Sequence, residues 1–289
     1  MQILCYNVSM KTRCLEDSKL KLSNDGQLSM FFIGTGSAFS KINFQTNLML
    51  IKGDTHILVD CGTLCPYALE TSYNCRVADI KNVILTHPHS DHIGGVEELV
   101  LVGRYVAKNK PNIIITDEFK QKLWDESLRG GCQYSEEGMM TFDDYFTQIK
   151  PKLINKEPFE IFESDFGGIN IKLFRTMHVT TIPDSFENAQ YSQGLIIDDR
   201  ILFSGDTQFK PKQLEWILER YNNIEYIFHD CDVSGYSDGV HASYEQLKTL
   251  SAEVKSKMFL CHYNSQAQKI APVEDGFAGF ARPGIYYDF

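Results

Sequence analysis

The sequence lacks the features that mark membrane, secreted and nucleic-acid-binding proteins. No apolar run approaches the ~20 residues of a membrane span, and the polar start around residues 10–13 is unlike a signal peptide. The eight cysteines form no C-x-x-C pair, so we expect reduced thiols. A net charge of -10 gives no general attraction for nucleic acid or for an anionic membrane. These absences favour a cytoplasmic protein that does not act on membranes.

Strand-like and helical runs alternate along the chain, without internal repeats or a long linker. We therefore expect a single domain over residues 1–289, in which residues 1–27 are an N-terminal extension forming a hairpin at a sheet edge. A chain of this length can bury a large core in one domain. The apolar spacing within residues 95–108 predicts a helix packed on the sheet through Val96, Leu99, Val100 and Val106.

The densest group of chemically active side chains follows the apolar run 83–85. His87, His89, Asp91 and His92 place three imidazoles and one carboxylate within six positions. Imidazole nitrogen and carboxylate oxygen are ligands of first-row metal ions. A turn after a strand can direct His87 and His89 toward one ion, and Asp91 and His92 toward a second. The spacing therefore predicts a metal site at a strand end.

Three later residues stand where apolar runs stop, and they can complete such a site. His178, Asp206 and His262 each occupy that position. Ligands at the same ends of several strands converge on one rim of a sheet, where open α/β architectures place their sites. His56 lies inside the strand-like run 55–60, and we interpret it as an ordinary strand residue.

These residues resemble the metallo-β-lactamase superfamily, whose H-x-H-x-D-H motif matches the segment 87–92. The resemblance runs from about residue 30 to about residue 265. It implies an α/β (α+β) fold, a four-layered αββα sandwich, and two divalent metal ions, zinc first, with manganese or iron as alternatives. It implies that one ion takes His87, His89 and His178, that the other takes Asp91, His92 and His262, and that Asp206 bridges them.

The region from residue 228 onward is similar to the ribonuclease Z branch of this superfamily. The similarity lies in 229–232, 241–243 and 262–265, and the opening segment 32–39 agrees with it. It implies phosphodiester cleavage, in which two ions activate a shared water and offset developing charge. By this resemblance His241 donates a proton to the leaving oxygen and Asp230 orients the ring. Asp230 stands where the family has glutamate, and Asp91 is a further catalytic candidate, as a base.

The substrate is predicted from a missing feature. Ribonuclease Z enzymes grip transfer RNA with a basic, Gly/Pro-rich arm, and no such arm is evident in the sequence. A small cyclic nucleotide is therefore the first choice, because the same branch includes cyclic-nucleotide phosphodiesterases. The alternatives are a transfer RNA 3′-processing endonuclease acting on RNA, a diiron redox protein of the same fold, and a binding module with a vestigial site. The resemblance also implies a homodimer.

The segment 116–156 interrupts the β pattern. It is either a functional surface, namely a substrate cap or a dimerisation surface, or a helical hairpin with its own small core. Arg129 could meet a phosphate or cap a helix. Five aromatic residues are candidates for stacking on a base, with core packing as the alternative: Phe142, Tyr145, Phe146, Phe186 and Tyr191. The aromatic stretch 275–289 is expected to pack across the fold or onto a partner subunit.

Overall fold

A computed structural model describes residues 10–235 and 239–289, and within them two eight-stranded sheets and a short hairpin. The first sheet has the order β1 (Lys11–Cys14), β18 (Ile285–Asp288), β2 (Ser29–Gly34), β3 (Asn47–Lys52), β4 (Thr55–Val59), β5 (Asn82–Ile84), β6 (Asn112–Ile114), β9 (Thr147–Ile149). The second has the order β10 (Lys152–Asn155), β11 (Ile161–Phe166), β12 (Ile169–Arg175), β13 (Gln193–Ile197), β14 (Ile201–Phe203), β15 (Tyr226–Asp230), β16 (Met258–Cys261), β17 (Gly279–Phe280). The hairpin pairs β7 (Tyr134–Ser135) with β8 (Gly138–Met139).

Helices connect these strands and cover the sheets. The α-helices are α1 (Cys65–Tyr73), α2 (Ser90–Ile93), α3 (Val96–Val102), α4 (Asp117–Leu123), α5 (Arg129–Cys132), α6 (Phe142–Tyr145), α7 (Pro211–Arg220), α8 (Tyr244–Lys248) and α9 (Ala252–Ser256). Two 3-10 helices, η1 (Val77–Asp79) and η4 (Ser265–Lys269), and two π-helical turns, η2 (Gly103–Ala107) and η3 (Trp124–Leu128), complete them. None of the helices in the described part of the chain is both long enough and apolar enough to cross a bilayer.

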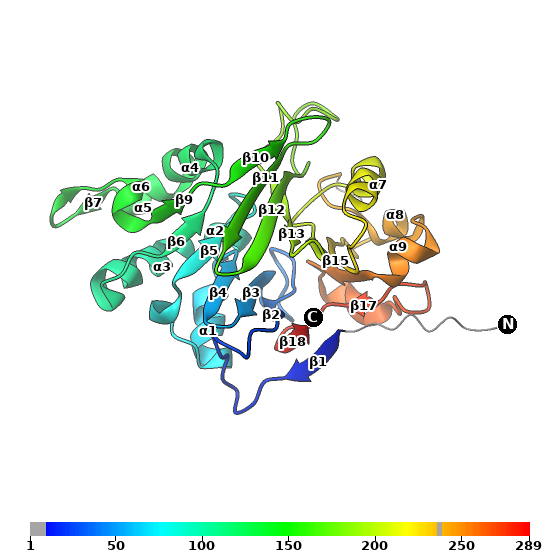
Figure 1. The fold of residues 1–289 in the computed structure, drawn as a ribbon, viewed down its shortest axis with the longest axis horizontal. Coiled ribbons are helices and arrows are strands. Elements are labelled where there is room, and N and C mark those ends of the chain that lie inside the picture. Colours follow the sequence, from blue (N-terminus) through cyan, green and yellow to red (C-terminus); the bar gives the residue numbers. More distant parts are fainter. Residues whose placement is uncertain (1–9, 236–238) are drawn as a thin grey trace.

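Side-chain alternation along the strands produces four layers. In β2, Met30 and Phe32 face the second sheet and share a buried cluster with Leu173, while Phe31 and Ile33 face the opposite way, onto helices. Figure 1 shows the two sheets between α1, α3 and α4 on one side and α7, α8 and α9 on the other. This arrangement confirms the predicted α/β class and the αββα sandwich.

The strand directions bring several chain segments to one edge. In the second sheet β14, β15 and β16 are parallel, and β12 has the same direction because both β12 and β14 are antiparallel to β13. In the first sheet β4 and β5 are parallel. The carboxyl ends of parallel strands meet at the same edge of a sheet, so the polar residues that follow them come together.

Both ends of the chain add strands to the sheets, and the described part of the N-terminal extension lies at a sheet edge as expected, while the hairpin within 1–27 stays a prediction. Within the described part of the extension 1–27, β1 is a single edge strand paired with β18; residues 1–9 of this extension lie outside the described residues. The aromatic stretch 275–289 supplies β17 to the second sheet and β18 to the first. It therefore packs across the fold, as one of its two interpretations predicted.

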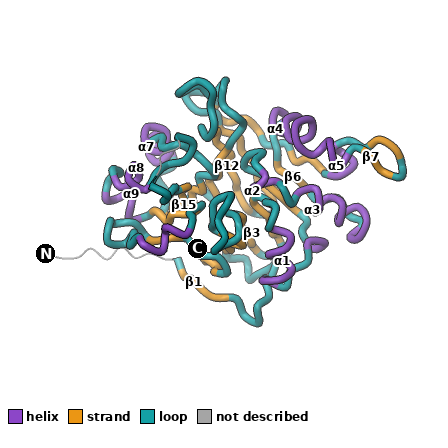
Figure 2. Tube along the Cα trace, turned by 180° about the vertical axis from the view of Figure 1, so that it is seen from behind, coloured by secondary structure: helices purple, strands orange, loops and turns teal. Residues whose placement is uncertain are grey.

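The segment 116–156 extends the first sheet through β9 and covers it with α4, α5 and α6. Phe142, Tyr145 and Phe146 are buried in the cluster on this face, so the prediction that they stack on a substrate is wrong. The hairpin of β7 and β8 projects away from the body of the molecule in Figures 1 and 2, and Tyr134 on it is 76% exposed. Arg129 lies beside Gln133 and Asp125 on the surface. Whether this segment is a cap or a dimer surface stays a prediction.

The helix predicted within 95–108 is present as α3 followed by η2. Val96, Leu99 and Val100 are buried against the first sheet, as expected. Val106 instead lies exposed on η2, because the wider π-helical turn shifts the apolar period away from the core.

Candidate metal centre

The motif after β5 becomes a compact turn that ends in α2. His89 is the residue before the first turn of α2, and Asp91 and His92 lie inside it. The turn packs tightly on the segment after β4: a Cβ on Gly62 would lie 1.9 Å from the Asp91 carbonyl oxygen, so only glycine fits there. Close packing of these two segments fixes the direction of the motif side chains.

Three histidine nitrogens form the first ligand group. His89 Nδ1 lies 3.0 Å from His87 Nε2 and 3.1 Å from His178 Nε2. His87 and His178 are almost completely buried, and His89 is half-buried. The structure therefore brings together the three residues that the sequence assigned to one ion.

Two carboxylates and two imidazoles form the second group. Asp91 Oδ2 and Asp206 Oδ2 each lie 3.3 Å from both His92 Nε2 and His262 Nε2. Asp206 Oδ2 also lies 3.7 Å from His87 Nε2 and 3.9 Å from His178 Nε2, so one oxygen faces both groups. All seven predicted ligands thus gather at one edge of the sandwich.

The distances within these groups fit divalent cations. Nitrogen and oxygen ligands at about 2.0–2.1 Å from a tetrahedral ion lie about 3.3–3.4 Å from one another. The four contacts of 3.3 Å in the second group match this spacing. Among the described residues no hydrogen-bond partner reaches the buried His92 Nε2, which is the atom aimed at the middle of this group. A cation between these ligands would satisfy this nitrogen, because a buried polar atom without a partner is costly.

A carboxylate that the sequence analysis did not single out orients two of the ligands. Asp60, the residue after β4, is fully buried and accepts hydrogen bonds from the His92 Nδ1 (2.7 Å) and from the Thr86 hydroxyl (2.8 Å). The Thr86 oxygen lies 3.0 Å from His87 Nδ1. When these Nδ1 atoms donate, both Nε2 lone pairs face the ligand groups. The signal in the sequence was an aspartate at the end of the strand-like run 55–60.

Two residues with left-handed backbone lie at this edge. Asp60 has φ 63° and His262 has φ 60°, in the left-handed region that non-glycine residues rarely adopt. Such residues persist where the surrounding structure holds them, and they are frequent at functional sites. Here the strained residues are His262, a candidate ligand, and Asp60, whose carboxylate is hydrogen-bonded to the candidate ligand His92.

The predicted dyad lies directly beside the second ligand group. His241 Nδ1 donates to Asp230 Oδ2 at 2.8 Å, so the aspartate reaches the ring although it is one methylene shorter than the glutamate of the family. Asp230 Oδ1 lies 3.4 Å from His262 Nδ1, and the His241 and His262 rings are stacked. The His241 side chain is 18% exposed and thus reaches the surface. His178 Nδ1 donates to the neighbouring Val240 carbonyl.

The pKa values follow from burial and from these neighbours. Burial, assisted by nearby imidazoles, lowers the pKa of His87, His89 and His178, which favours the neutral form that binds metal. Burial opposes ionisation of Asp206, but the surrounding histidines outweigh it and hold its pKa well below the usual range. Burial likewise disfavours the charged form of His241, but Asp230 outweighs it and raises the pKa of His241 to about 9.

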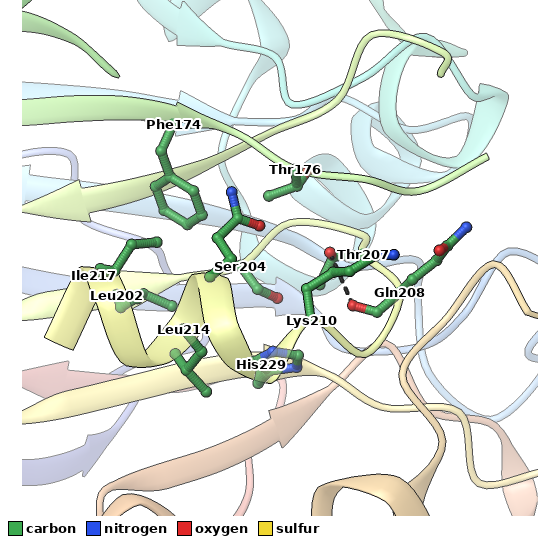
Figure 3. Close-up of a pocket in the computed structure, with 11 residues that line it drawn as sticks. Phe174, Thr176, Leu202, Ser204, Thr207, Gln208, Lys210, Leu214, Ile217 and His229 are labelled. Carbon is green, nitrogen blue, oxygen red and sulfur yellow. Dashed lines mark hydrogen bonds between the residues drawn. The ribbon is translucent and has the colours of Figure 1, made fainter. Parts of the chain in front are cut away.

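A small cavity lies between β12, β14 and α7, beside the segment that carries Asp206 (Figure 3). The cavity volume is about 20 Å³, which is room for a single water molecule. Ser204, Thr207 and Gln208 line it together with apolar side chains of α7. The cavity is too small for a nucleotide, and its polar residues flank Asp206 in the chain.

The two further stacking candidates have different surroundings. Tyr191 is buried and stacks on Phe119 at 4.5 Å, so its prediction is wrong and the core-packing alternative holds. The ring centroids of Phe186 and Phe159 are 6.3 Å apart, in an edge-to-face arrangement. Phe186 also lines a surface cavity of about 470 Å³ together with Lys122 and Arg175. The cavity's lining contains none of the seven predicted ligands.

Comparison with known proteins agrees with this geometry. The fold and the paired His/Asp groups define a protein of the metallo-β-lactamase fold: the metallo-β-lactamase fold protein YhfI from Bacillus subtilis superposes with a TM-score of 0.65 at 16% identity, covering 90% of this chain and 99% of that one. This confirms the predicted metallo-β-lactamase fold.

The chain belongs to the family of the Anti-Pycsar protein Apyc1, whose family model matches residues 28–287. The Apyc1 of Paenibacillus sp. (strain J14) is 32% identical over 83% of this chain and 91% of its own length. The Apyc1 of Bacillus phage 010DV004 is 30% identical over 90% of this chain and 98% of its own length. The relationship therefore covers nearly the whole chain.

Proposed function

We propose that this protein is a metal-dependent phosphodiesterase that hydrolyses a small cyclic nucleotide. The observation that carries the proposal is the pair of ligand groups that share Asp206 Oδ2, with the dyad of Asp230 and His241 beside them. Zinc is the first choice for both positions, and manganese or iron can use the same nitrogen and oxygen ligands.

The chain's residues have separate tasks in this mechanism. His87, His89 and His178 would hold one ion, and Asp91, His92 and His262 the other, with Asp206 between them. Two bound ions would supply an activated water and Lewis acidity for the phosphoryl oxygens. Asp91, with its carboxylate beside His92 and His262, is also the candidate to accept a proton from the attacking water.

His241 is the proposed proton donor for the leaving oxygen. Asp230 raises the pKa of His241, which favours the protonated ring that a proton donor needs, and the position of this ring at the surface of the centre leaves it accessible to a substrate. Asp230 fixes the ring through Nδ1 and stabilises the imidazolium. Two-ion centres stabilise charge but provide no proton of their own, so this dyad completes the reaction.

The choice of a cyclic nucleotide is supported by the family. The relatives are named Anti-Pycsar proteins, and Pycsar is a cyclic-nucleotide signalling system. The projecting hairpin of β7 and β8 carries Glu136 and Glu137, both beside Arg104, and so does not resemble the basic arm with which ribonuclease Z enzymes grip transfer RNA. By resemblance we also propose a cytoplasmic homodimer, and sedimentation of the purified protein tests the dimer.

The test is turnover of a panel of 3′,5′-cyclic mononucleotides beside a 3′-extended transfer RNA precursor, with added zinc or manganese. We expect hydrolysis of cyclic nucleotides alone, and loss of this activity in His87→Ala. Cleavage of the precursor would replace the proposal with transfer RNA processing. Bound iron with redox activity and no hydrolysis would favour the diiron alternative.

A further inference from the structure

The loop between β2 and β3 exposes an aromatic side chain. Phe39 on this loop is 88% exposed, the largest value for a large apolar side chain in the described part of the chain. Ile42 and Leu64 are also exposed, at 43% and 36%. A phenylalanine ring almost fully in water is a feature to explain, because burial of aromatic surface is strongly favourable.

One side of this loop is attached to the residue after His262. Ser37 N donates to the Tyr263 carbonyl at 3.0 Å, and Tyr263 N donates to the Thr35 carbonyl at 3.2 Å. Gly36 pairs with Tyr263 as an isolated β-bridge. These contacts fix the beginning of the loop beside a ligand of the second group.

The other side is attached to the segment that packs on Asp91. The buried Gln45 amide links the two: its Oε1 accepts from Leu64 N at 3.0 Å, and its Nε2 donates to the Ala38 carbonyl at 3.5 Å. Gly62, two residues before Leu64, is in close contact with Asp91. The loop therefore spans the segments that carry Asp91 and His262, and Phe39 follows directly after the Ala38 contact.

We propose that Phe39, flanked by Ile42 and Leu64, is the surface on which the base of the nucleotide substrate stacks. The inference rests on the proposed function, since it assigns a place to the base once the phosphodiester lies at the metal centre. An aromatic ring stacks on any base, so Phe39 provides affinity for nucleotides as a class. Three side chains suffice to cover one planar base, whereas a stable protein interface needs roughly 800 Å² on each partner.

The first test is steady-state kinetics of Phe39→Ala with 3′,5′-cyclic mononucleotides. We expect KM to rise by about 5- to 100-fold, the range given by loss of one base–aromatic stack. The kcat and the metal content stay within about twofold, because the ring does not touch the ligands. Phe39→Trp restores the KM. The matched control is Tyr134→Ala, which removes another exposed aromatic from the projecting hairpin and leaves KM unchanged.

A binding measurement separates stacking from other effects. The chain has two tryptophans, so the emission of Phe39→Trp changes over a small background. We expect a cyclic nucleotide to quench this added emission in the zinc-loaded variant, while inorganic phosphate does not. No quenching, with the KM of Phe39→Ala equal to wild type, overturns the inference and leaves the proposed function intact.

Other outcomes are equally decisive. If Phe39→Ala loses metal or kcat, the ring supports the fold of the loop and the stacking role is wrong. If Phe39→Ala changes the sedimentation of the protein without changing KM, a second copy occupies the surface and the role is again wrong. If wild-type protein hydrolyses no nucleotide, the proposed function fails, and the inference fails with it.

Discussion

Each end of β4 lies at a buried histidine, and the two histidines have different hydrogen-bond partners. At the amino end His56 is buried, and its Nε2 accepts a hydrogen bond from the Lys81 backbone at 3.1 Å. At the carboxyl end, about 13 Å away at the rise of a strand, Asp60 holds His92, whose Nε2 meets two carboxylate oxygens and no donor. One ring is satisfied by a backbone donor of the protein itself, and the other faces two carboxylate oxygens that could bind a cation together with it.

This difference teaches that burial alone does not define a functional histidine. Burial lowers the pKa of His56 to about 4, and its backbone partner keeps it neutral and inert. At the other end, carboxylates on both sides of the ring raise the pKa of His92 well above its ordinary value. The convergence of ring nitrogens and carboxylates without a donor between them is what indicates a metal centre.

The largest effect is expected for Asp206→Ala, which removes the oxygen that faces both ligand groups. Both ions bind weakly in the variant, and turnover falls by at least about 10³-fold, because several kcal/mol of charge stabilisation are lost. Elemental analysis together with the hydrolysis rate measures this. Asp184→Ala, which removes an exposed carboxylate paired with Lys210, is the matched control. Full metal content in Asp206→Ala would contradict the bridging role.

His241→Ala separates proton donation from metal binding. Turnover should fall by about 10²- to 10⁴-fold, the usual contribution of a general acid. The metal content should stay at the wild-type value, because the dyad lies beside the ligand groups. The rate and the metal content are measured on the same preparation. An unchanged rate would remove His241 from the mechanism.

Asp60→Asn tests the carboxyl end of β4 directly. An amide cannot accept as strongly from both His92 and Thr86, so the His92 ring loses its orientation. Metal affinity should fall by about 10- to 100-fold, as for other residues that support a ligand. Competition with a chelator measures the affinity. If both proteins release metal at the same chelator concentration, Asp60 has only a packing role.

The smallest effect is expected at the amino end of β4, in stability alone. The folded-state pKa of His56, about 4, lies below its ordinary value of 6.5, so the unfolded chain takes up a proton that the native chain does not. The contribution of neutral His56 to the free energy of unfolding is therefore complete above pH 6.5 and is lost as the pH falls toward 4. Relative to His56→Gln, wild-type protein should lose about 1–2 kcal/mol between pH 7 and pH 5.

Denaturant unfolding of both proteins at several pH values measures this difference. Metal content and turnover at pH 7 should be equal in the two proteins, since His56 contacts Lys81 and not the ligand groups. A parallel pH dependence of the two unfolding free energies would show that His56 titrates normally. Loss of metal in His56→Gln would contradict the conclusion that the histidine at the amino end of β4 has no part in metal binding.

The sequence predicted which candidate ligands gather at one edge better than it predicted their surroundings. His87, His89, Asp91 and His92 are close in the chain, and His178, Asp206 and His262 each follow a strand of the second sheet. Local spacing and strand ends are readable without coordinates. Four of the five aromatic candidates, Phe142, Tyr145, Phe146 and Tyr191, were wrong because such residues look alike in the sequence whether they face solvent or core, and only packing decides that.

The sequence also did not reveal Asp60 and Gln45, which hold other site residues in place. Asp60 acts through His92, which is 32 positions away in the chain, and Gln45 links Ala38 to Leu64 across two loops. No periodicity reports such contacts. They exist because the first sheet folds β4 beside β5 and places the β2–β3 loop over the same edge.

The sequence by itself determined the class of fold, the kinds of ligand atoms and their order, because strand alternation and motif spacing are local properties of the chain. The tertiary structure alone decided which oxygen lies between the two ligand groups, which carboxylate orients His92, and which aromatic ring remains exposed on the β2–β3 loop. Those properties depend on how the two sheets align their strand ends, and alignment is a matter of packing between segments far apart in the sequence.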